Sequence, residues 1–289
     1  MERLINEYIK YLEEIKNLNS KTIKVYIPHI KNMVNYCGYK NIVDLENATI
    51  IQLNKWINSK NDMSNQYINQ MIASSKSFFG FLMAYRYISF NPAKELKALK
   101  IESKGKTGDL SQIKKIREYV KNEYDKKPSF NNLRNILIVE VLLQTAVRNS
   151  ELRQLNTDSI KADGSFTVIQ KGGSRKQCVL NSKAMKIYNK YIEERNKIIS
   201  KDNALFISSY KSRLSSKGLE NIIGNITSAT GQKLKPHDMR HTSATAYVNA
   251  GYACDEVAKL LGHSNSNTTY KFYYHQNKND KKSMAENVF

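Results

Sequence analysis

The sequence predicts a mainly helical protein of two parts, with a small β-sheet in the second part. Apolar residues recur at helical spacing through the first hundred residues. A polar stretch with two glycines interrupts the chain at 100–108, and two short strand-like runs flank a Gly-Gly turn further on. At about 150 residues per domain, the 289 residues suit one large or two ordinary domains. We therefore expect a helical domain at 1–99, a linker at 100–108 and a second domain at 109–289.

The first hundred residues are expected to form four helices. Apolar positions with a 3.6-residue period mark the stretches 4–15, 23–34, 50–57 and 67–82. Asn19 and Ser64 are capping residues placed before the second and fourth stretches. Pro28 lies inside the second stretch and predicts a kink or a late start. Pro92, after Asn91, ends the region.

The second part begins with a new helix after Asp109. Residues 132–144 are strongly apolar and predict a helix that is buried on most sides. Residues 165–170 and 176–180 predict a β-hairpin around the Gly172-Gly173 turn. The remainder is expected to be helical, with caps or breaks at Ser182, Ser215, Pro236, Gly251 and Gly262.

Several classes of protein are excluded by composition. The sequence contains no stretch of about 18 uncharged apolar residues, which a membrane-spanning helix would need. The N-terminal residues include acids and lack the apolar segment of a secretory signal. The three cysteines are few, odd in number and far apart, so they support neither a disulfide framework nor a thiolate zinc site. We expect a cytoplasmic protein.

The net charge of +20 points to a polyanionic partner. Residues 1–108 carry 16 basic and 9 acidic residues, and residues 109–289 carry 30 and 17, so both parts are basic. DNA phosphates suit such a surface, because Lys and Arg release the counterions of the phosphates. The simpler alternative is solubility in a lysine-rich protein, since 36 of the 46 basic residues are lysine. A membrane surface is a third possible partner, but the sequence shows no basic amphipathic helix with a Trp or Phe face that would favour it.

Five short motifs stand out in the second part. In chain order they are Thr145-Ala-Val-Arg-Asn-Ser-Glu-Leu, Lys171 in the hairpin turn, His237-Asp-Met-Arg-His, Leu260-Leu-Gly-His, and Tyr270-Lys-Phe-Tyr-Tyr-His. Singly, each has an ordinary explanation: Arg148, for example, would be a cation in the last turn of a helix. Their order and spacing together carry the signal.

These motifs resemble those of the tyrosine recombinase (phage integrase) family. The family pattern is T-G-x-R-x-x-E-L, a lysine in a G-K-G hairpin, H-x-x-R-H, L-G-H and a following tyrosine. The resemblance covers the whole chain. It implies an N-terminal helical core-binding (SAM-like) domain and a mostly helical catalytic domain with a small β-sheet. It also implies site-specific cleavage and rejoining of DNA without metal, nucleotide or other cofactor.

The resemblance assigns Arg148 and Arg240 to the scissile phosphate. Two guanidiniums can hold the non-bridging oxygens and remain charged at any relevant pH, which stabilises the charge that develops during attack. Glu151, one turn after Arg148, would support that arginine. Ala146 stands where the family has glycine.

Proton transfer is assigned to Lys171, His237 and His263. Lys171 would protonate the leaving 5′-oxygen, His237 would act as acid or base or orient the phosphate, and His263 would donate to a phosphate oxygen. The hairpin departs from the family, with Gln170 before the lysine and Val179 in place of proline. Arg175 and Lys176 therefore remain alternative proton donors.

Three tyrosines compete as the nucleophile that forms a covalent 3′-phosphotyrosine. The family's Tyr-x-His pattern selects Tyr273, with Tyr274 second and Tyr270 third. Tyr273 lies ten residues after His263, whereas nine is common in the family. The nine-residue register falls on Phe272, which cannot attack, so a one-residue insertion is required.

Three other functions remain as alternatives. A DNA-binding protein that no longer cuts would tolerate the shifted tyrosine register. An enzyme similar to type IB topoisomerases would relax DNA without partners. His237 and His241 have zinc-ligand spacing, but Asp238 replaces the usual glutamate and no third ligand is evident, which disfavours a zinc hydrolase.

The resemblance also implies partners. Two protomers would bind inverted arms of a double-stranded core site, and two such dimers would form a tetramer. Residues 276–289 would pack on a neighbouring protomer through Met284, Val288 and Phe289. DNA-bending or directionality proteins would be accessory factors.

Overall fold

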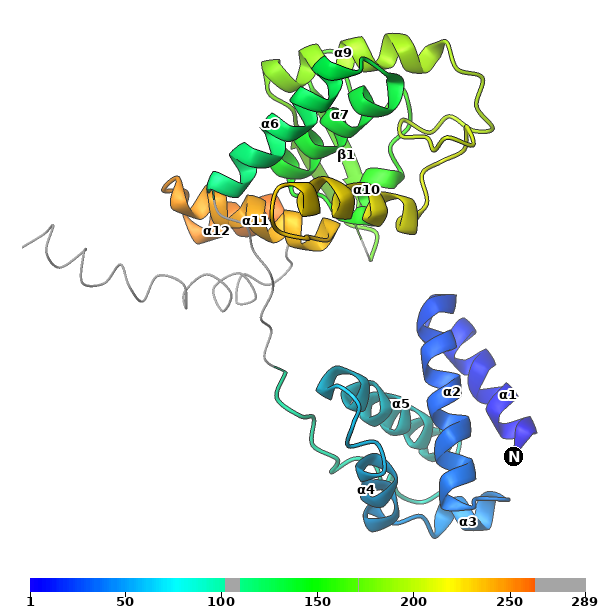
Figure 1. Ribbon diagram of the computed structural model, residues 1–289. Helices are drawn as coiled ribbons and strands as arrows, with labels where there is room; N and C mark the ends of the chain where they lie inside the picture. Colours follow the sequence, from blue (N-terminus) through cyan, green and yellow to red (C-terminus); the bar gives the residue numbers. More distant parts are fainter. Residues whose placement is uncertain (102–109, 171, 263–289) are drawn as a thin grey trace, which may run out of the picture. The chain divides into compact units, whose positions relative to one another are not determined.

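The chain divides into two compact units, Met1–Ser103 and Lys104–Phe289 (Figure 1). The computed structural model describes residues 1–101, 110–170 and 172–262. In these residues the chain is mostly helical, with a single two-stranded sheet, which confirms the predicted fold class. No helix among them is both long and apolar enough to cross a bilayer.

The first unit consists of helices around one apolar core. Its elements are α1 (Glu2–Lys10), a turn of π-helix η1 (Tyr11–Ile15), α2 (Ser20–Cys37), α3 (Ile42–Glu46), α4 (Ile50–Asn58) and α5 (Asn65–Ala84). The Asn19 side chain caps α2 by accepting from the Thr22 amide, and α2 runs through Pro28 without a late start. The sequence did not predict α3, whose five residues are held by a capping box between Asn41 and Asp44.

The second unit surrounds the apolar helix α7. Its elements are α6 (Leu110–Lys126), α7 (Phe130–Thr145), α8 (Asn149–Arg153), β1 (Ser165–Ile169), β2 (Arg175–Val179), α9 (Ser182–Asn196), α10 (Ser216–Ala229), α11 (Pro236–Asn249) and α12 (Cys254–Leu261). Helices α6, α9 and α11 all contact α7, and Figure 1 shows α6 and α9 packed beside it. As predicted, α7 is buried on most sides.

Strands β1 and β2 form the predicted antiparallel hairpin. The register pairs Ser165 with Val179 and Ile169 with Arg175. Phe166, Val168 and Cys178 point into the core, and the residues between them face outward, as the alternation of a strand requires. The buried face of β2 places Lys176 beside the end of α7, which brings a hairpin residue to the site described next.

Candidate active site

The C-terminal end of α7 is the structural centre of the candidate site. The helix ends at Thr145, and Ala146 adopts the left-handed conformation with φ 48° and ψ 33°. A left-handed residue other than glycine costs about 1–2 kcal/mol, so the surrounding contacts must hold this turn. Arg148 follows two residues later, at the N-cap of α8. The turn therefore sets the position of the Arg148 backbone.

Four consecutive carbonyls at this end accept hydrogen bonds from side chains of other elements. We call the carbonyls of Leu143, Gln144, Thr145 and Ala146 the α7 carbonyl cluster. In the same order their donors are Ser243 Oγ (2.5 Å), Tyr247 Oη (2.9 Å), Lys176 Nζ (2.6 Å) and Arg240 Nη1 (2.8 Å). The last carbonyls of a helix have no partner within the helix, so these side chains supply what the helix lacks.

Arg240 joins the ends of two helices. It is buried, at 3% exposed. Its Nη1 donates to the Ala146 carbonyl and its Nη2 donates to the Leu261 carbonyl, at 2.5 Å, at the end of α12. Both carbonyls lie at the negative ends of helix dipoles, which stabilise a buried cation. The guanidinium thus has a fixed orientation between α7 and α12.

Arg148 occupies an electrostatically unfavourable place that Glu151 offsets. The residue begins α8 rather than ending a helix, so the last-turn explanation for this cation is wrong. A cation at a helix N-terminus is opposed by the dipole. The buried Glu151 carboxylate accepts from the Arg148 amide at 2.8 Å and from Arg148 Nη1 at 2.7 Å. Glu151 therefore fixes both the backbone and the guanidinium of Arg148.

His237 and His241 lie on one side of α11, with ring centroids 4.5 Å apart in an edge-to-face arrangement. His237, in the first turn of the helix, is exposed, and His241 is half-buried. Partial burial of the ring lowers the pKa of His237, and the positive charges of Arg240 and Arg148 lower it further against the opposing charge of Asp238. At neutral pH the His237 imidazole is therefore uncharged and able to accept a proton.

The hairpin lysine candidates occupy different environments. Lys176 is buried at 5% exposed, and this burial lowers its pKa to about 8. Its ammonium is bound to the Thr145 carbonyl, which gives it an orienting contact in the α7 carbonyl cluster. Arg175 is exposed on the other face of the strand. Lys171 lies outside the described residues.

The described neighbours of two other site candidates are in contact. The Gln170 side chain packs so closely on Gly262 that a Cβ there would lie 2.0 Å from Gln170 Nε2. Gln170 precedes Lys171 in the chain, and Gly262 precedes His263. The contact therefore brings the hairpin turn to the end of α12, where Arg240 is also anchored. His263, Tyr270, Tyr273 and Tyr274 lie outside the described residues.

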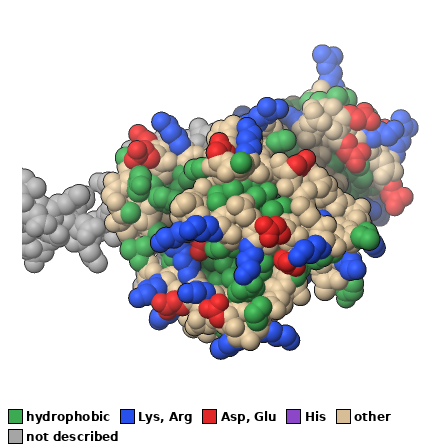
Figure 2. Space-filling model, turned by 90° about the horizontal axis from the view of Figure 1, so that it is seen from above, with side chains coloured by type: hydrophobic (Ala, Val, Ile, Leu, Met, Phe, Trp, Pro, Cys, Tyr) green, Lys and Arg blue, Asp and Glu red, His purple; other side chains and the backbone are tan. Residues whose placement is uncertain are grey.

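Among the described residues, neither a metal cluster nor the groove beside α7 belongs to this arrangement. Within residues 1–101, 110–170 and 172–262, no three His, Cys, Asp or Glu side chains gather into a possible metal site. A groove of about 590 Å³ lies between α6, α7 and α9, lined by apolar residues and by both basic and acidic side chains, and contains none of the residues above. Figure 2 shows one face of the protein, on which Lys and Arg side chains are dispersed among apolar and acidic ones.

Sequence reasoning missed Ser243, Tyr247 and the orienting contact of Lys176. A signal was present for the first two. Arg240, Ser243 and Tyr247 are spaced i, i+3 and i+7, so they share one face of α11, and that face carries hydrogen-bonding groups. Nothing in the sequence indicated that the face meets helix carbonyls, because the partners lie about one hundred residues earlier.

Known families match both units of the chain. The Phage integrase family matches residues 108–280, and its N-terminal SAM-like domain matches residues 5–85. A similar curated protein is the tyrosine recombinase XerC of Leptospira interrogans, 24% identical over 269 residues that cover 91% of this chain and 86% of the relative.

Solved structures share the fold. The XerH site-specific recombinase, bound to a palindromic difH substrate in a post-cleavage complex, is similar with a TM-score of 0.79 and 18% identity, covering 97% of this chain and 84% of that one. A lambda integrase tetramer bound to a Holliday junction has a TM-score of 0.71 and 19% identity, covering 92% and 77%.

Proposed function

Because the chain belongs to the phage integrase family, we propose that its second unit cleaves and rejoins DNA with Arg148, Arg240, Lys171, His237, His263 and Tyr273. The protein is a tyrosine site-specific recombinase, an enzyme that breaks and rejoins DNA strands through a covalent tyrosine intermediate. The observation that carries the residue assignment is the α7 carbonyl cluster. It anchors Arg240 at the carbonyl of Ala146, two residues before Arg148.

The two arginines would bind the scissile phosphate. Attack on phosphorus places negative charge on the non-bridging oxygens, and preorganised guanidiniums stabilise that charge. Arg240 is oriented by two carbonyls and Arg148 by Glu151, so contacts within the protein set the direction of each guanidinium. The Arg148 side chain is 34% exposed, so a DNA phosphate can contact it.

Tyr273 would be the nucleophile. Its oxygen attacks phosphorus, a 3′-phosphotyrosine bond forms and the bond to the 5′-oxygen breaks. The leaving 5′-oxygen takes a proton from Lys171, since Lys176 is bound to the Thr145 carbonyl. His237, whose lowered pKa keeps it neutral, would accept the phenolic proton that Tyr273 loses in the attack, and His263 would donate to a phosphate oxygen. Reversal of the step by a 5′-hydroxyl rejoins the strand without ATP.

Trapping the covalent adduct tests this proposal. DNA flanking the protein's own gene, nicked near the site so that the cleaved strand cannot religate, would be incubated with wild type, Tyr273→Phe and Tyr274→Phe. Denaturing gels should show an adduct with wild type and Tyr274→Phe and none with Tyr273→Phe. Loss in Tyr274→Phe alone would move the nucleophile to that residue.

The same gels separate the alternative functions. A salt-sensitive shift on native gels without any adduct would support a DNA-binding protein that does not cut. Relaxation of supercoiled plasmid without a site requirement would support a topoisomerase-like enzyme. An adduct that requires a particular DNA site supports the recombinase.

We also propose double-stranded DNA with inverted arms as the substrate and a tetramer, a dimer of dimers, as the active assembly. A DNA substrate would place the work of the enzyme in the cytoplasm. The lambda integrase relative forms a tetramer on a Holliday junction, and XerH binds a palindromic site, which supports both proposals. Deleting residues 280–289, which hold Met284, Val288 and Phe289, should weaken assembly more than binding to a single site. Unchanged assembly after the deletion would contradict a role for this segment between protomers.

A further inference from the structure

The position of Arg148 depends on how the short helix α8 is held. The helix has only five residues, Asn149–Arg153, and so short a helix has almost no stability of its own. Arg148 is its N-cap, and Arg153 is its last residue, about 8 Å further along at 1.5 Å per residue. Contacts at the far end of α8 therefore influence the direction in which Arg148 points.

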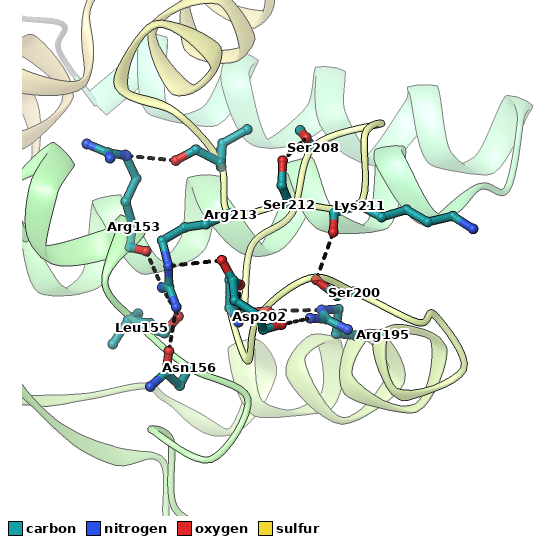
Figure 3. Close-up of polar contacts among 12 residues, drawn as sticks. Arg153, Leu155, Asn156, Arg195, Ser200, Asp202, Ser208, Lys211, Ser212 and Arg213 are labelled. Carbon is teal, nitrogen blue, oxygen red and sulfur yellow. Dashed lines mark hydrogen bonds and ion pairs between the residues drawn. The ribbon is translucent and has the colours of Figure 1, made fainter.

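Two arginines connect that far end to the loop between α9 and α10. Arg213 Nη1 donates to the carbonyls of Arg153 (2.7 Å) and Leu155 (3.2 Å). Arg213 Nη2 donates to Asn156 Oδ1 at 2.8 Å. In the reverse direction, Arg153 Nε donates to the Leu214 carbonyl at 2.7 Å. Figure 3 shows Arg213, in the loop, reaching the segment that contains Arg153 and Asn156.

Arg213 is itself held from the loop side. The Asp202 carboxylate lies 3.7 Å from Arg213 Nε. The backbone of Arg213 also forms a short antiparallel bridge with Ile207. Arg195, at the end of α9, holds the same loop by donating to the carbonyls of Ala204, Ile198 and Asp202. The hydrogen bonds of Arg195 end within the loop, whereas those of Arg213 reach α8 (Figure 3).

We infer that Arg213 is a positioning residue, which orients Arg148 through α8 without touching the DNA phosphate itself. Its planar fork bonds the last carbonyl of α8 and the backbone just beyond, and its positive charge suits the negative end of that helix. Glu151 fixes Arg148 at the beginning of α8, and Arg213 holds the end of the same helix. The inference rests on the proposed catalytic role of Arg148, and the loop between α9 and α10 then becomes part of the catalytic framework.

Arg195 offers a matched control. It is a buried arginine that donates to three backbone carbonyls of the same loop, and none of them belongs to α8. Arg213→Gln and Arg195→Gln should therefore both lower the stability of the loop. Only Arg213→Gln should disturb Arg148. Arg213→Lys keeps the charge and one donor group, so it should give an intermediate effect and serves as the second variant if Arg213→Gln does not fold.

The test follows the Arg148 guanidinium directly by NMR on the full chain labelled with nitrogen-15 at arginine. The Nε–H signal of Arg148, assigned by its loss in Arg148→Lys, should shift or broaden in Arg213→Gln and stay in place in Arg195→Gln. In parallel, single-turnover formation of the covalent adduct should fall tenfold or more in Arg213→Gln, with DNA affinity within twofold of wild type.

The two readouts separate the inference from the proposed function. An Arg148 signal unchanged in both Arg213 variants would overturn the inference, whatever the DNA assays give. A shifted signal in Arg213→Gln and not in Arg195→Gln supports it. A shifted signal together with a wild-type protein that forms no adduct would uphold the positioning of Arg148 and refute its proposed role in cleavage. Equal shifts in Arg213→Gln and Arg195→Gln would reduce Arg213 to general support of the loop and overturn the inference.

Discussion

Lys176 is a buried cation whose cost depends on pH. Burial lowers its pKa in the folded protein to about 8, whereas an unfolded chain keeps it near 10.5. Between these values the unfolded chain binds the proton that the folded protein has lost. The contribution of Lys176 to the free energy of unfolding therefore rises with pH across this window, by up to about 1.4 kcal/mol per pH unit.

Lys176→Met removes this dependence. Below pH 8 both states of the wild type carry the proton, so its difference in unfolding free energy from the variant is constant. From pH 8 to 9.5 the wild type should gain stability relative to Lys176→Met, measured by urea unfolding at half-unit steps. Comparison with the variant cancels the titration of groups that do not interact with Lys176. A constant difference from pH 7 to 9.5 would contradict the assigned burial.

Replacing Glu151 should slow cleavage more than the accompanying loss of protein stability would explain. Glu151→Gln removes the charge that balances Arg148 and turns an amide donor toward other donors, at a cost of about 1–3 kcal/mol. We expect adduct formation to fall at least tenfold. Glu140→Gln is the control, because Glu140 binds Arg117 through two bonds in the same unit but away from Arg148. A Glu140→Gln variant that cleaves as poorly as Glu151→Gln would indicate a general stability effect.

At the scale of elements, α11 supports the end of α7 through Ser243, Tyr247 and Arg240. Tyr247→Phe leaves the Gln144 carbonyl without its donor and should lower the unfolding free energy by about 1 kcal/mol. It should also slow cleavage, because a carbonyl of the α7 carbonyl cluster orients the Arg240 guanidinium. Tyr188→Phe removes hydroxyl bonds to the carbonyls of Thr157 and Ile160 elsewhere in the unit. It should cost similar stability without slowing cleavage, and an equal slowing in both variants would refute the role of the cluster.

Elements with strong local signals could be predicted from the sequence, and elements set by distant contacts could not. The caps Asn19 and Ser64 and the apolar period gave α2 and α5, and alternation around Gly172-Gly173 gave the hairpin. Helix α3 was missed because five residues show no period. The motifs selected Arg148 and Arg240 as candidates. They did not indicate that Lys176 would be buried or that Arg213 would bond the end of α8, since both contacts join distant segments.

At the scale of the whole molecule, each unit has an apolar core built from its own residues, which predicts two units that fold independently. A fragment of residues 1–101 is large enough to bury a core of its own and should unfold cooperatively on heating, followed by circular dichroism. Residues 110–289 should bind DNA more weakly than the full chain, with a shallower dependence of log Kd on log salt, because fewer phosphates are neutralised and the tether is lost. Equal affinities and slopes would show that the first unit does not contribute to binding.

The proposed mechanism requires that Arg148 and Arg240 neutralise the charge of the scissile phosphate. The most direct measurement compares adduct formation on a normal phosphodiester with that on a methylphosphonate at the same position, which lacks the negative charge. Arg148→Ala and Arg240→Ala should lose at least a hundredfold in rate on the phosphodiester and recover most of it on the methylphosphonate. Equal losses on the two substrates would contradict the claim, and the arginines would then serve structure alone.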